Sequence, residues 1–207
     1  MFKLRQCVLL CMLFLILGGC NNDASLKTYL GSDAKLLVKE ENAELYDTVS
    51  AMMKKEYELE FGLHVGYGTS DTLTSINGKK NYILFEYDNV HCWADFEARL
   101  AEVYDETYII SLRSMLTEGD MPQFVDYEGG LYRSFADSGI KAVDPDKIQL
   151  YRITEDTLAL VSEEHASVFN IYLSEYITNS DETEEIYILY LKQNAEKPYG
   201  YEIMSLK

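Results

Sequence analysis

Apolar residues recur at helical spacing in the first half of the chain and at strand spacing in the second half. From Asn42 onward they fall three or four positions apart, which predicts a helix that Asn42 caps and Gly62 ends. The apolar face of this helix is formed by Leu45, Val49, Met52, Met53, Tyr57 and Phe61. A stripe of aliphatic, methionine and aromatic residues is typical of a core contact, so we predict no other role for it.

Two further helices are predicted in the middle of the chain. The first begins near Trp93, with Asp88 or Asn89 as its N-cap, and its apolar residues again follow helical spacing. They are Trp93, Phe96, Leu100, Val103 and Tyr104. The second covers residues 105–119, and Pro122 prevents its continuation because proline lacks the backbone N–H that a helix interior needs.

A β-hairpin is predicted between the first helix and these two. Residues 73–76 and 80–87 have strand character and flank Asn77-Gly78, a pair that tolerates the positive φ angles of a type I′ turn. Residues 82–85 are apolar at every position, so we expect both faces of this strand to be covered.

Strand patterns fill the chain after residue 147. Five apolar or alternating segments are separated by short polar turns, which predicts an antiparallel meander. They are residues 148–153, 158–162, 168–177, 186–191 and 199–204. Helices early and strands late favour an α+β fold, a single domain over residues 36–207 in which N-terminal helices pack on a curved antiparallel sheet of about five or more strands.

Residues 119–140 fit neither pattern. The segment is rich in glycine and acid, and it is long for a connection inside a compact domain, so we expect an irregular loop that binds a partner. Its acidic and aromatic candidates for that contact are Asp120, Asp126, Tyr127, Glu128, Tyr132 and Asp137. A second acidic segment, residues 181–185, is more typical of a solvated hairpin end.

The N-terminus has the layout of an export signal followed by a tether. A cationic start precedes an apolar run that is too short to span a bilayer, as in a secretory signal peptide over residues 1–19. The ending Leu17-Gly18-Gly19-Cys20 resembles the lipobox of bacterial lipoproteins, whose cysteine is acylated and becomes the new N-terminus. The resemblance implies lipidation of Cys20 and a location on the outer side of the cell membrane. The polar stretch that follows, with Gly31 and Ser32, predicts that residues 20–35 form the lipidated N-terminus and a short tether. The alternative is an ordinary signal peptide with a cysteine near its cleavage site.

The chain is strongly acidic, since 35 acidic and 18 basic residues give a net charge of −17. Removal of residues 1–19 would take basic residues away and leave the mature chain more acidic still. Such a charge repels nucleic acids and anionic lipid head groups, so a basic protein is the favoured partner. Cys92 would be the only thiol left after processing and lipidation, which excludes a disulfide within the chain.

The sequence contains no recognisable catalytic or metal-binding motif. Its three histidines lie outside the arrangements of zinc and hydrolase sites, and glycine-rich phosphate loops are absent. His91 beside Cys92 suggests a thiol nucleophile, but neighbours in a helix point in different directions, so we expect Cys92 to be a small core residue. Pro145 between Asp144 and Asp146 breaks a calcium-loop pattern. We therefore expect neither an enzyme nor a cofactor or metal site.

The order of elements and one glycine-rich motif resemble the DL-endopeptidase inhibitor family of Gram-positive bacteria. The residues that carry the resemblance are Glu128, Gly130, Leu131, Tyr132, Asp137 and Gly139. The resemblance implies an α+β inhibitor over residues 36–207 that places an acidic loop in the groove of a hydrolase that cleaves peptidoglycan stem peptides. The layout is also similar to the nuclear-transport-factor-like cone fold, which by itself says little about function.

Two functions are consistent with these features. In the first, a surface lipoprotein binds a protein partner, most specifically a cell-wall endopeptidase whose groove is occluded by residues 119–140. In the alternative, the concave face of the sheet binds a small ligand. A deep apolar pocket between the sheet and the first helix would favour the alternative, and a sheet face filled by side chains would disfavour it.

Overall fold

The computed structural model describes residues 26, 29–64, 73–120, 122–134, 147–162, 174–178 and 185–205. The predicted signal peptide, the predicted lipidation site Cys20 and the predicted contact residue Asp137 lie outside these ranges. Within them, every helix is too short or too polar to cross a membrane.

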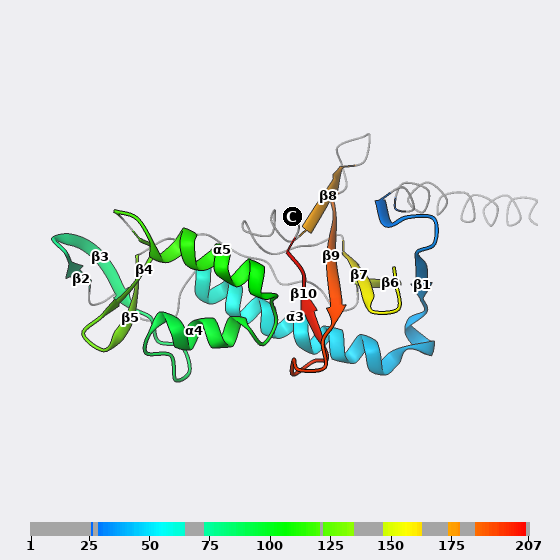
Figure 1. Cartoon of the computed structure of the whole chain (residues 1–207), viewed down its shortest axis with the longest axis horizontal. Coiled ribbons are helices and arrows are strands. Elements are labelled where there is room, and N and C mark those ends of the chain that lie inside the picture. Colours follow the sequence, from blue (N-terminus) through cyan, green and yellow to red (C-terminus); the bar gives the residue numbers. More distant parts are fainter. Residues whose placement is uncertain are drawn as a thin grey trace, which may run out of the picture.

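The fold is α+β, as the sequence predicts, but it contains two antiparallel sheets where one was expected. The helices are α3 (Ala43–His64), α4 (Trp93–Leu100), α5 (Glu106–Thr117) and a short 3₁₀ helix, η1 (Lys39–Glu41). Sheet A consists of β1 (Lys35–Leu37), β6 (Gln149–Arg152), β7 (Thr157–Ser162), β8 (Ser174–Thr178), β9 (Glu185–Gln193) and β10 (Tyr201–Ile203). Sheet B consists of β2 (Thr74–Ile76), β3 (Lys79–Leu84), β4 (Phe124–Tyr127) and β5 (Gly130–Ser134). The two sheets lie at opposite ends of an elongated molecule (Figure 1).

Sheet A is not the simple meander that the strand pattern predicts. Its order is β1-β6-β7-β9-β10, and β8 also pairs with β9. Because β7 and β8 both pair with the residue Leu189, they lie on opposite edges of β9. Strands β7 and β8 are consecutive among the described strands of the chain but are separated by β9 in the sheet. Strand β1, which the strand pattern does not predict, is added beside β6.

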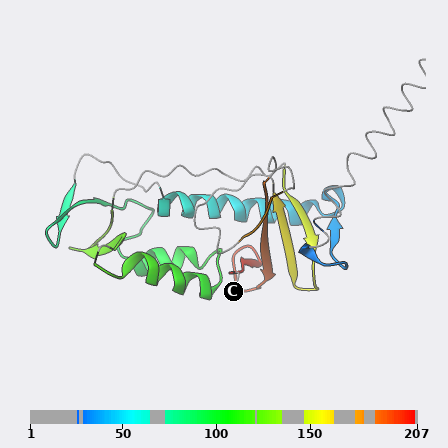
Figure 2. The ribbon, with the colours of Figure 1, turned by 90° about the horizontal axis from the view of Figure 1, so that it is seen from above.

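Helix α3 connects the two sheets. At its first turns, the hydroxyl of Tyr46 donates to the carbonyl of Leu37 at 2.9 Å and accepts from the backbone N–H of Leu150 at 3.0 Å, both in sheet A. At its last turn, the carbonyl of His64 accepts from Nη2 of Arg133 in sheet B at 3.0 Å. Twenty-two residues at 1.5 Å each make α3 about 33 Å long, and Figure 2 shows it running along the molecule from sheet A toward sheet B. The predicted stop at Gly62 is wrong, because the helix continues to His64.

The inner face of sheet A packs against α3 to form the main core. Leucines from four strands contact the apolar face of the helix, where Val49 and Met52 are fully buried. These sheet residues are Leu37, Leu150, Leu158, Leu160, Leu189 and Leu191. The core continues along α3 to α4 and α5, so a single apolar cluster joins both ends of the molecule. Of the predicted apolar stripe, Val49, Met52 and Met53 are buried in this core and Leu45 packs against it. Tyr57 and Phe61 are half-buried and lie outside the cluster, so the prediction is confirmed only for the first part of the stripe.

The opposite face of sheet A is also covered. The helical residues Leu26 and Leu30 are each 6% exposed and pack on Tyr151, Ala159, Val161 and Ile188. These leucines belong to the stretch 20–35 that was expected to be a tether, and β1 begins inside the same stretch. The described part of that stretch is therefore packed on the domain rather than extended away from it.

Helices α4 and α5 begin at short polar caps. The N-cap of α4 is Cys92, and the carboxylate of Asp95 accepts from the backbone N–H groups of His91 and Cys92 at 2.9 and 3.2 Å. The predicted caps at Asp88 and Asn89 are therefore wrong, and Cys92 is a half-buried cap rather than a core residue. Helix α5 begins as predicted, since Asp105 accepts from the backbone N–H of Tyr108 at 2.8 Å.

Candidate functional site

The predicted irregular loop over residues 119–140 is in part a β-hairpin. Strands β4 and β5 pair in register from Phe124↔Arg133 to Tyr127↔Gly130. Glu128 and Gly129 form the turn with φ angles of 47° and 80°, the pair of positive values that a two-residue type I′ turn requires. The expectation of an irregular loop is wrong here, and the segment holds a defined shape at the end of the molecule that is remote from sheet A (Figure 1).

Sheet B has one face toward the core and one face outward. In β5, Leu131 and Arg133 are fully buried, while the alternating residues Gly130, Tyr132 and Ser134 are half-buried. Residues directly opposite one another across a strand pair lie on the same face, so the register defines the outward surface. Tyr82 and Ser134 share this side of the sheet, but Tyr82 is buried. We name the remaining part the outer face, and it consists of Leu84, Val125, Tyr127, Gly130 and Tyr132.

The outer face is a continuous apolar surface. The rings of Tyr127 and Tyr132 meet edge to face, with centroids 6.0 Å apart at 78°. Leu84 is 42% exposed, which contradicts the expectation that residues 82–85 are covered on both faces. A Cβ atom on Gly130 would lie 2.8 Å from Cδ1 of Leu84 and 3.2 Å from Cε2 of Tyr132, so both side chains lie over the glycine backbone. This glycine therefore allows three strands to form one surface.

An acidic group borders the outer face at its turn. The carboxylate of Glu128 accepts a hydrogen bond from the hydroxyl of Tyr127, and this bond together with the nearby negative charge raises the pKa of Tyr127. Glu128 is exposed, so its charge is available to a partner that contacts the two tyrosines. The structure thus brings together three of the predicted contact residues: Tyr127, Glu128 and Tyr132.

Two other predicted contact residues lie apart from the outer face. Asp126 is exposed but projects from the opposite face of β4, where its carboxylate accepts from the backbone N–H of Trp93 at 2.7 Å. This bond ties the hairpin to the first turn of α4. Asp120 is exposed and follows α5, before the hairpin begins.

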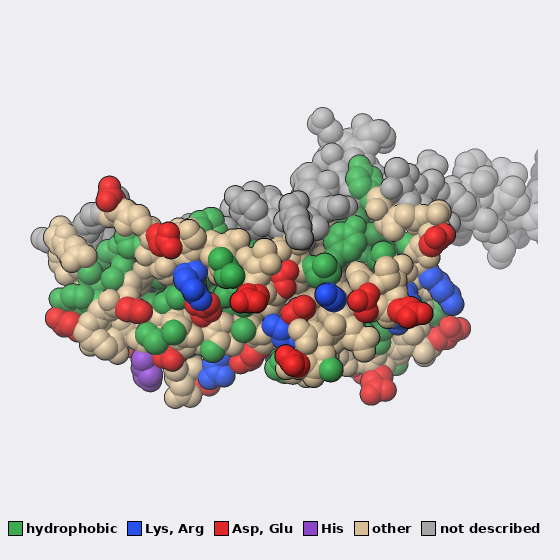
Figure 3. Space-filling model, in the orientation of Figure 1, with side chains coloured by type: hydrophobic (Ala, Val, Ile, Leu, Met, Phe, Trp, Pro, Cys, Tyr) green, Lys and Arg blue, Asp and Glu red, His purple; other side chains and the backbone are tan. Residues whose placement is uncertain are grey.

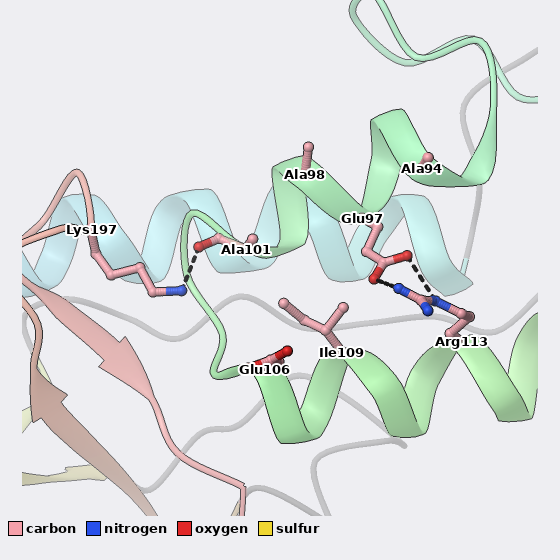
Figure 4. A pocket seen from close by; sticks show the side chains of 8 residues that line it. All are labelled: Ala94, Glu97, Ala98, Ala101, Glu106, Ile109, Arg113 and Lys197. Carbon is pink, nitrogen blue, oxygen red and sulfur yellow. Dashed lines mark hydrogen bonds and ion pairs between the residues drawn. The ribbon is translucent and has the colours of Figure 1, made fainter.

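A groove between α4 and α5 is a second candidate site. It has a volume of about 460 Å³, and Figure 4 shows three alanines and several charged side chains around it. The lining residues are Ala94, Glu97, Ala98, Ala101, Glu106, Ile109, Arg113 and Lys197. Its cations already have partners: Arg113 forms a two-pronged ion pair with Glu97, and Nζ of Lys197 donates to the carbonyl of Ala101 at 2.7 Å. The groove therefore presents methyl groups and cations that already have partners within the protein.

The inner face of sheet A is filled by side chains along its described strands. Its leucines are in direct contact with α3 along the described part of the sheet. A shallow hollow of about 320 Å³ lies instead beside the first turns of α3, next to Tyr199 and Tyr201. The filled inner face disfavours the alternative function of small-ligand binding.

A buried acidic cluster lies on α3 between the two sheets. Glu56, Glu60 and His64 occur at every fourth position and are each less than 5% exposed. Oε1 of Glu60 accepts from the hydroxyls of Tyr104 at 2.6 Å and Tyr108 at 3.4 Å. Oε2 of Glu60 lies 3.3 Å from Nε2 of His64. The sequence pattern missed this cluster, although two glutamates on the apolar face of the first helix were a visible signal.

The electrostatics of this cluster favour the neutral form of one carboxyl. Burial and the negative charge of Glu60 raise the pKa of Glu56 well above its usual range, and Oε2 of Glu56 has no hydrogen-bond partner among the described residues. Burial and the two glutamates also raise the pKa values of Tyr104 and Tyr108. Within the described ranges, histidine, cysteine and acidic side chains form no group that could hold a metal ion. The cluster is enclosed and has no surface for a partner.

Comparisons with known proteins leave these geometric observations as the basis for function. No family model, no curated protein and no solved structure matches the chain. The outer face, with its paired tyrosines, exposed leucine and acidic turn, is the candidate site that best fits contact with another molecule.

Proposed function

We propose that the protein is a surface lipoprotein that binds another protein through the outer face of sheet B. The observation that carries the proposal is the edge-to-face pair of Tyr127 and Tyr132 beside the exposed Leu84. Rigid aromatic side chains on a flat apolar surface are typical anchors of protein interfaces. The type I′ turn and the bond from Asp126 to α4 hold this surface in place before a partner arrives, which lowers the entropic cost of binding.

The charge of the protein favours a basic partner. The net charge is −17, and acidic side chains are spread along the face that Figure 3 shows. Glu128 brings a carboxylate to the edge of the outer face itself. Such a distribution accelerates the approach of a positively charged surface and disfavours nucleic acid.

In its most specific form, the proposed partner is a peptidoglycan DL-endopeptidase. The support is the resemblance of residues 128–139 to the inhibitor family, together with the lipobox, which would place both proteins outside the cytoplasm. In this proposal the Glu128-Gly129 turn enters the substrate groove of the hydrolase and the tyrosines contact its rim. Inhibition would then be steric, and no residue of this chain would need to react.

A binding and inhibition assay with a purified DL-endopeptidase tests both levels of the proposal. We expect the protein to bind the hydrolase and to suppress its cleavage of peptidoglycan at saturation. Tyr132→Ala should weaken binding about tenfold or more, because interface tyrosines are frequent hot spots. The matched control is Ile110→Ala, which removes an equally apolar side chain, 53% exposed, from α5.

The possible results distinguish binding through the outer face from inhibition of an endopeptidase by occlusion of its groove. Binding without inhibition would reject the occlusion of the groove and keep the outer face as a binding surface. Equal effects of Tyr132→Ala and Ile110→Ala, with unchanged circular dichroism, would reject the outer face. Full hydrolase activity and no binding at saturating protein would reject the endopeptidase as the partner.

A further inference from the structure

The residues that follow the predicted lipid anchor are packed on sheet A. Leu26 and Leu30 are buried on its face, and β1 then pairs with β6 from Lys35↔Arg152 to Leu37↔Leu150. From Leu26 onward the chain is therefore fixed to the domain at described positions. If Cys20 is lipidated as proposed above, the five residues between Cys20 and Leu26, which we call the leash, limit how far Leu26 can lie from the bilayer.

This leash is short. Six peptide steps separate Cys20 from Leu26, and a fully extended chain covers at most about 3.5 Å per residue, so the leash reaches about 20 Å. Sheet A must therefore stay close to the bilayer surface. A domain on a long tether could turn freely, whereas this one can present only the surfaces near Leu26 to the lipid.

The surface near Leu26 carries exposed apolar side chains. Tyr29 is 50% exposed, Leu36 is 47% exposed and Val38 is 44% exposed. All three lie within a ten-residue stretch at the end of the molecule where the chain enters the domain, drawn in blue in Figure 1. Tyrosine and aliphatic side chains are favoured at the boundary between head groups and acyl chains.

Among the described residues, the surface formed by Tyr29, Leu36 and Val38 has no excess of positive charge around it that would attract anionic lipid. Lys35 and Lys39 are exposed beside it, but so are Glu40 and Glu41, so the local charges balance, and the protein as a whole is acidic. The contact with lipid would therefore depend on apolar side chains and on the leash rather than on attraction to anionic head groups.

The outer face of sheet B lies at the other end of α3. Tyr46 at the start of the helix is bonded to sheet A, and His64 at its end is bonded to Arg133 of β5. The length of α3, about 33 Å, separates the two ends. Acidic side chains along the face between them, shown in Figure 3, would oppose a flat orientation on anionic lipid.

We propose that Tyr29, Leu36 and Val38 form a membrane-contacting end, so that the lipoprotein stands on sheet A and presents the outer face of sheet B away from the bilayer. The occupant of this apolar surface is the head-group boundary of the membrane to which Cys20 is anchored. The proposal rests on the proposed lipid anchor and assigns an orientation that the anchor alone does not determine.

Tryptophan quenching in vesicles tests this orientation. The full-length acylated protein, purified from host membranes, is reconstituted into vesicles of phosphatidylglycerol and phosphatidylethanolamine with brominated acyl chains. The chain has one tryptophan, Trp93, which lies at the sheet B end and supplies the baseline. Leu36→Trp places a probe at the membrane-contacting end, and Leu84→Trp places a matched, similarly exposed probe on the outer face.

We expect brominated lipid to cause a clear loss of fluorescence for Leu36→Trp, and no loss for Leu84→Trp or for Trp93. The loss should persist in high salt, and Tyr29→Ser with Val38→Ser should reduce it. Equal quenching of both probes would mean that the domain lies flat and would overturn the proposal, as would the absence of quenching at both. Intact mass of the purified protein reports acylation separately, and hydrolase binding reports the outer face, so failure of either is distinguishable from a wrong orientation.

Discussion

Sheet A and sheet B are both antiparallel, but they differ in what covers them. Sheet A has α3 on one face and the leucines 26 and 30 on the other, and β7 is buried at five of its six positions. Sheet B has α4 and α5 against its inner face, while its outer face keeps Leu84, Tyr127 and Tyr132 accessible. A sheet with both faces covered contributes to the stability of the fold, whereas a sheet with one exposed apolar face can also bind another molecule.

The largest expected effect on stability comes from replacing leucine by alanine in sheet A, compared with the same replacement in sheet B. Leu160→Ala in β7 removes a side chain that is fully buried, and we expect a loss of about 2–5 kcal/mol in the free energy of unfolding. Leu84→Ala on the outer face should cost less than about 0.5 kcal/mol. Urea unfolding of both variants measures the difference. Similar losses at the two positions would mean that the outer face is covered in solution.

The next largest effect concerns the cover on the second face of sheet A. Leu26→Asp places an unpaired charge against Tyr151 and Val161, and we expect it to release the N-terminal segment and forfeit about 1.5–3 kcal/mol of apolar burial. Tyr29→Asp, on an exposed position of the same segment, is the control. Faster tryptic cleavage after Lys35 in Leu26→Asp alone would confirm the difference. Equal cleavage rates in the two variants would show that Leu26 does not hold the segment.

A third effect probes the acidic cluster that lies between the sheets. The pKa of Glu56 is raised in the folded state by burial and by Glu60, so the folded chain binds more protons than the unfolded chain above a pH of about 4.5. This contribution is complete below the unfolded pKa and is lost as the pH rises through the folded pKa, at up to about 1.4 kcal/mol per pH unit. We expect Glu56→Gln to flatten that slope in urea unfolding between pH 4.5 and 8. An unchanged slope, equal to that of the exposed control Glu44→Gln, would contradict the assignment.

The substitution with the smallest expected effect on stability is the one that should change the outer face the most. Gly130→Ala would bring a Cβ atom within 2.8 Å of Cδ1 of Leu84, a flexible group that can move, so we expect a loss of about 1 kcal/mol or less together with a disturbed outer face. Gly200→Ala is the control, because its φ of 69° is strained for alanine and should cost about 1 kcal/mol, far from sheet B. Partner affinity should fall for Gly130→Ala and stay constant for Gly200→Ala. The reverse result would remove the outer face from consideration.

The helices and the first hairpin were predictable because their signals are local. Asp105 caps α5 through its own side chain, and Asn77 and Gly78 have the positive φ angles that their residue types favour. The cap of α4 was misplaced because Asp95, three residues into the capping box, gives the N-cap role to Cys92, a residue type rarely expected there.

The second hairpin of sheet B, β4–β5, was not predictable by the same reasoning. Its β4–β5 turn has Glu128 at a left-handed φ of 47°, a conformation that glutamate seldom adopts, so the turn lacked the usual Asn-Gly signal. The cover on sheet A was missed because Leu26 and Leu30 stand in a polar stretch, and only the tertiary structure supplies the surface that buries them. Of the predicted contact residues, Tyr127, Glu128 and Tyr132 lie together at the outer face and its turn. Asp126 lies on the opposite face of β4, because successive side chains of a strand point to opposite faces.

The pairing of β1 with β6 also has a consequence for the order of events during folding. The hydroxyl of Tyr46 and the backbone N–H of Leu150 meet across 104 positions in the sequence, with the whole of sheet B between them. Contacts of such long range form slowly, because a large loop must close before they contribute. Because sheet A combines the first described strand with the last ones, it would be completed only after the C-terminal strands are available, although its first strand is made early.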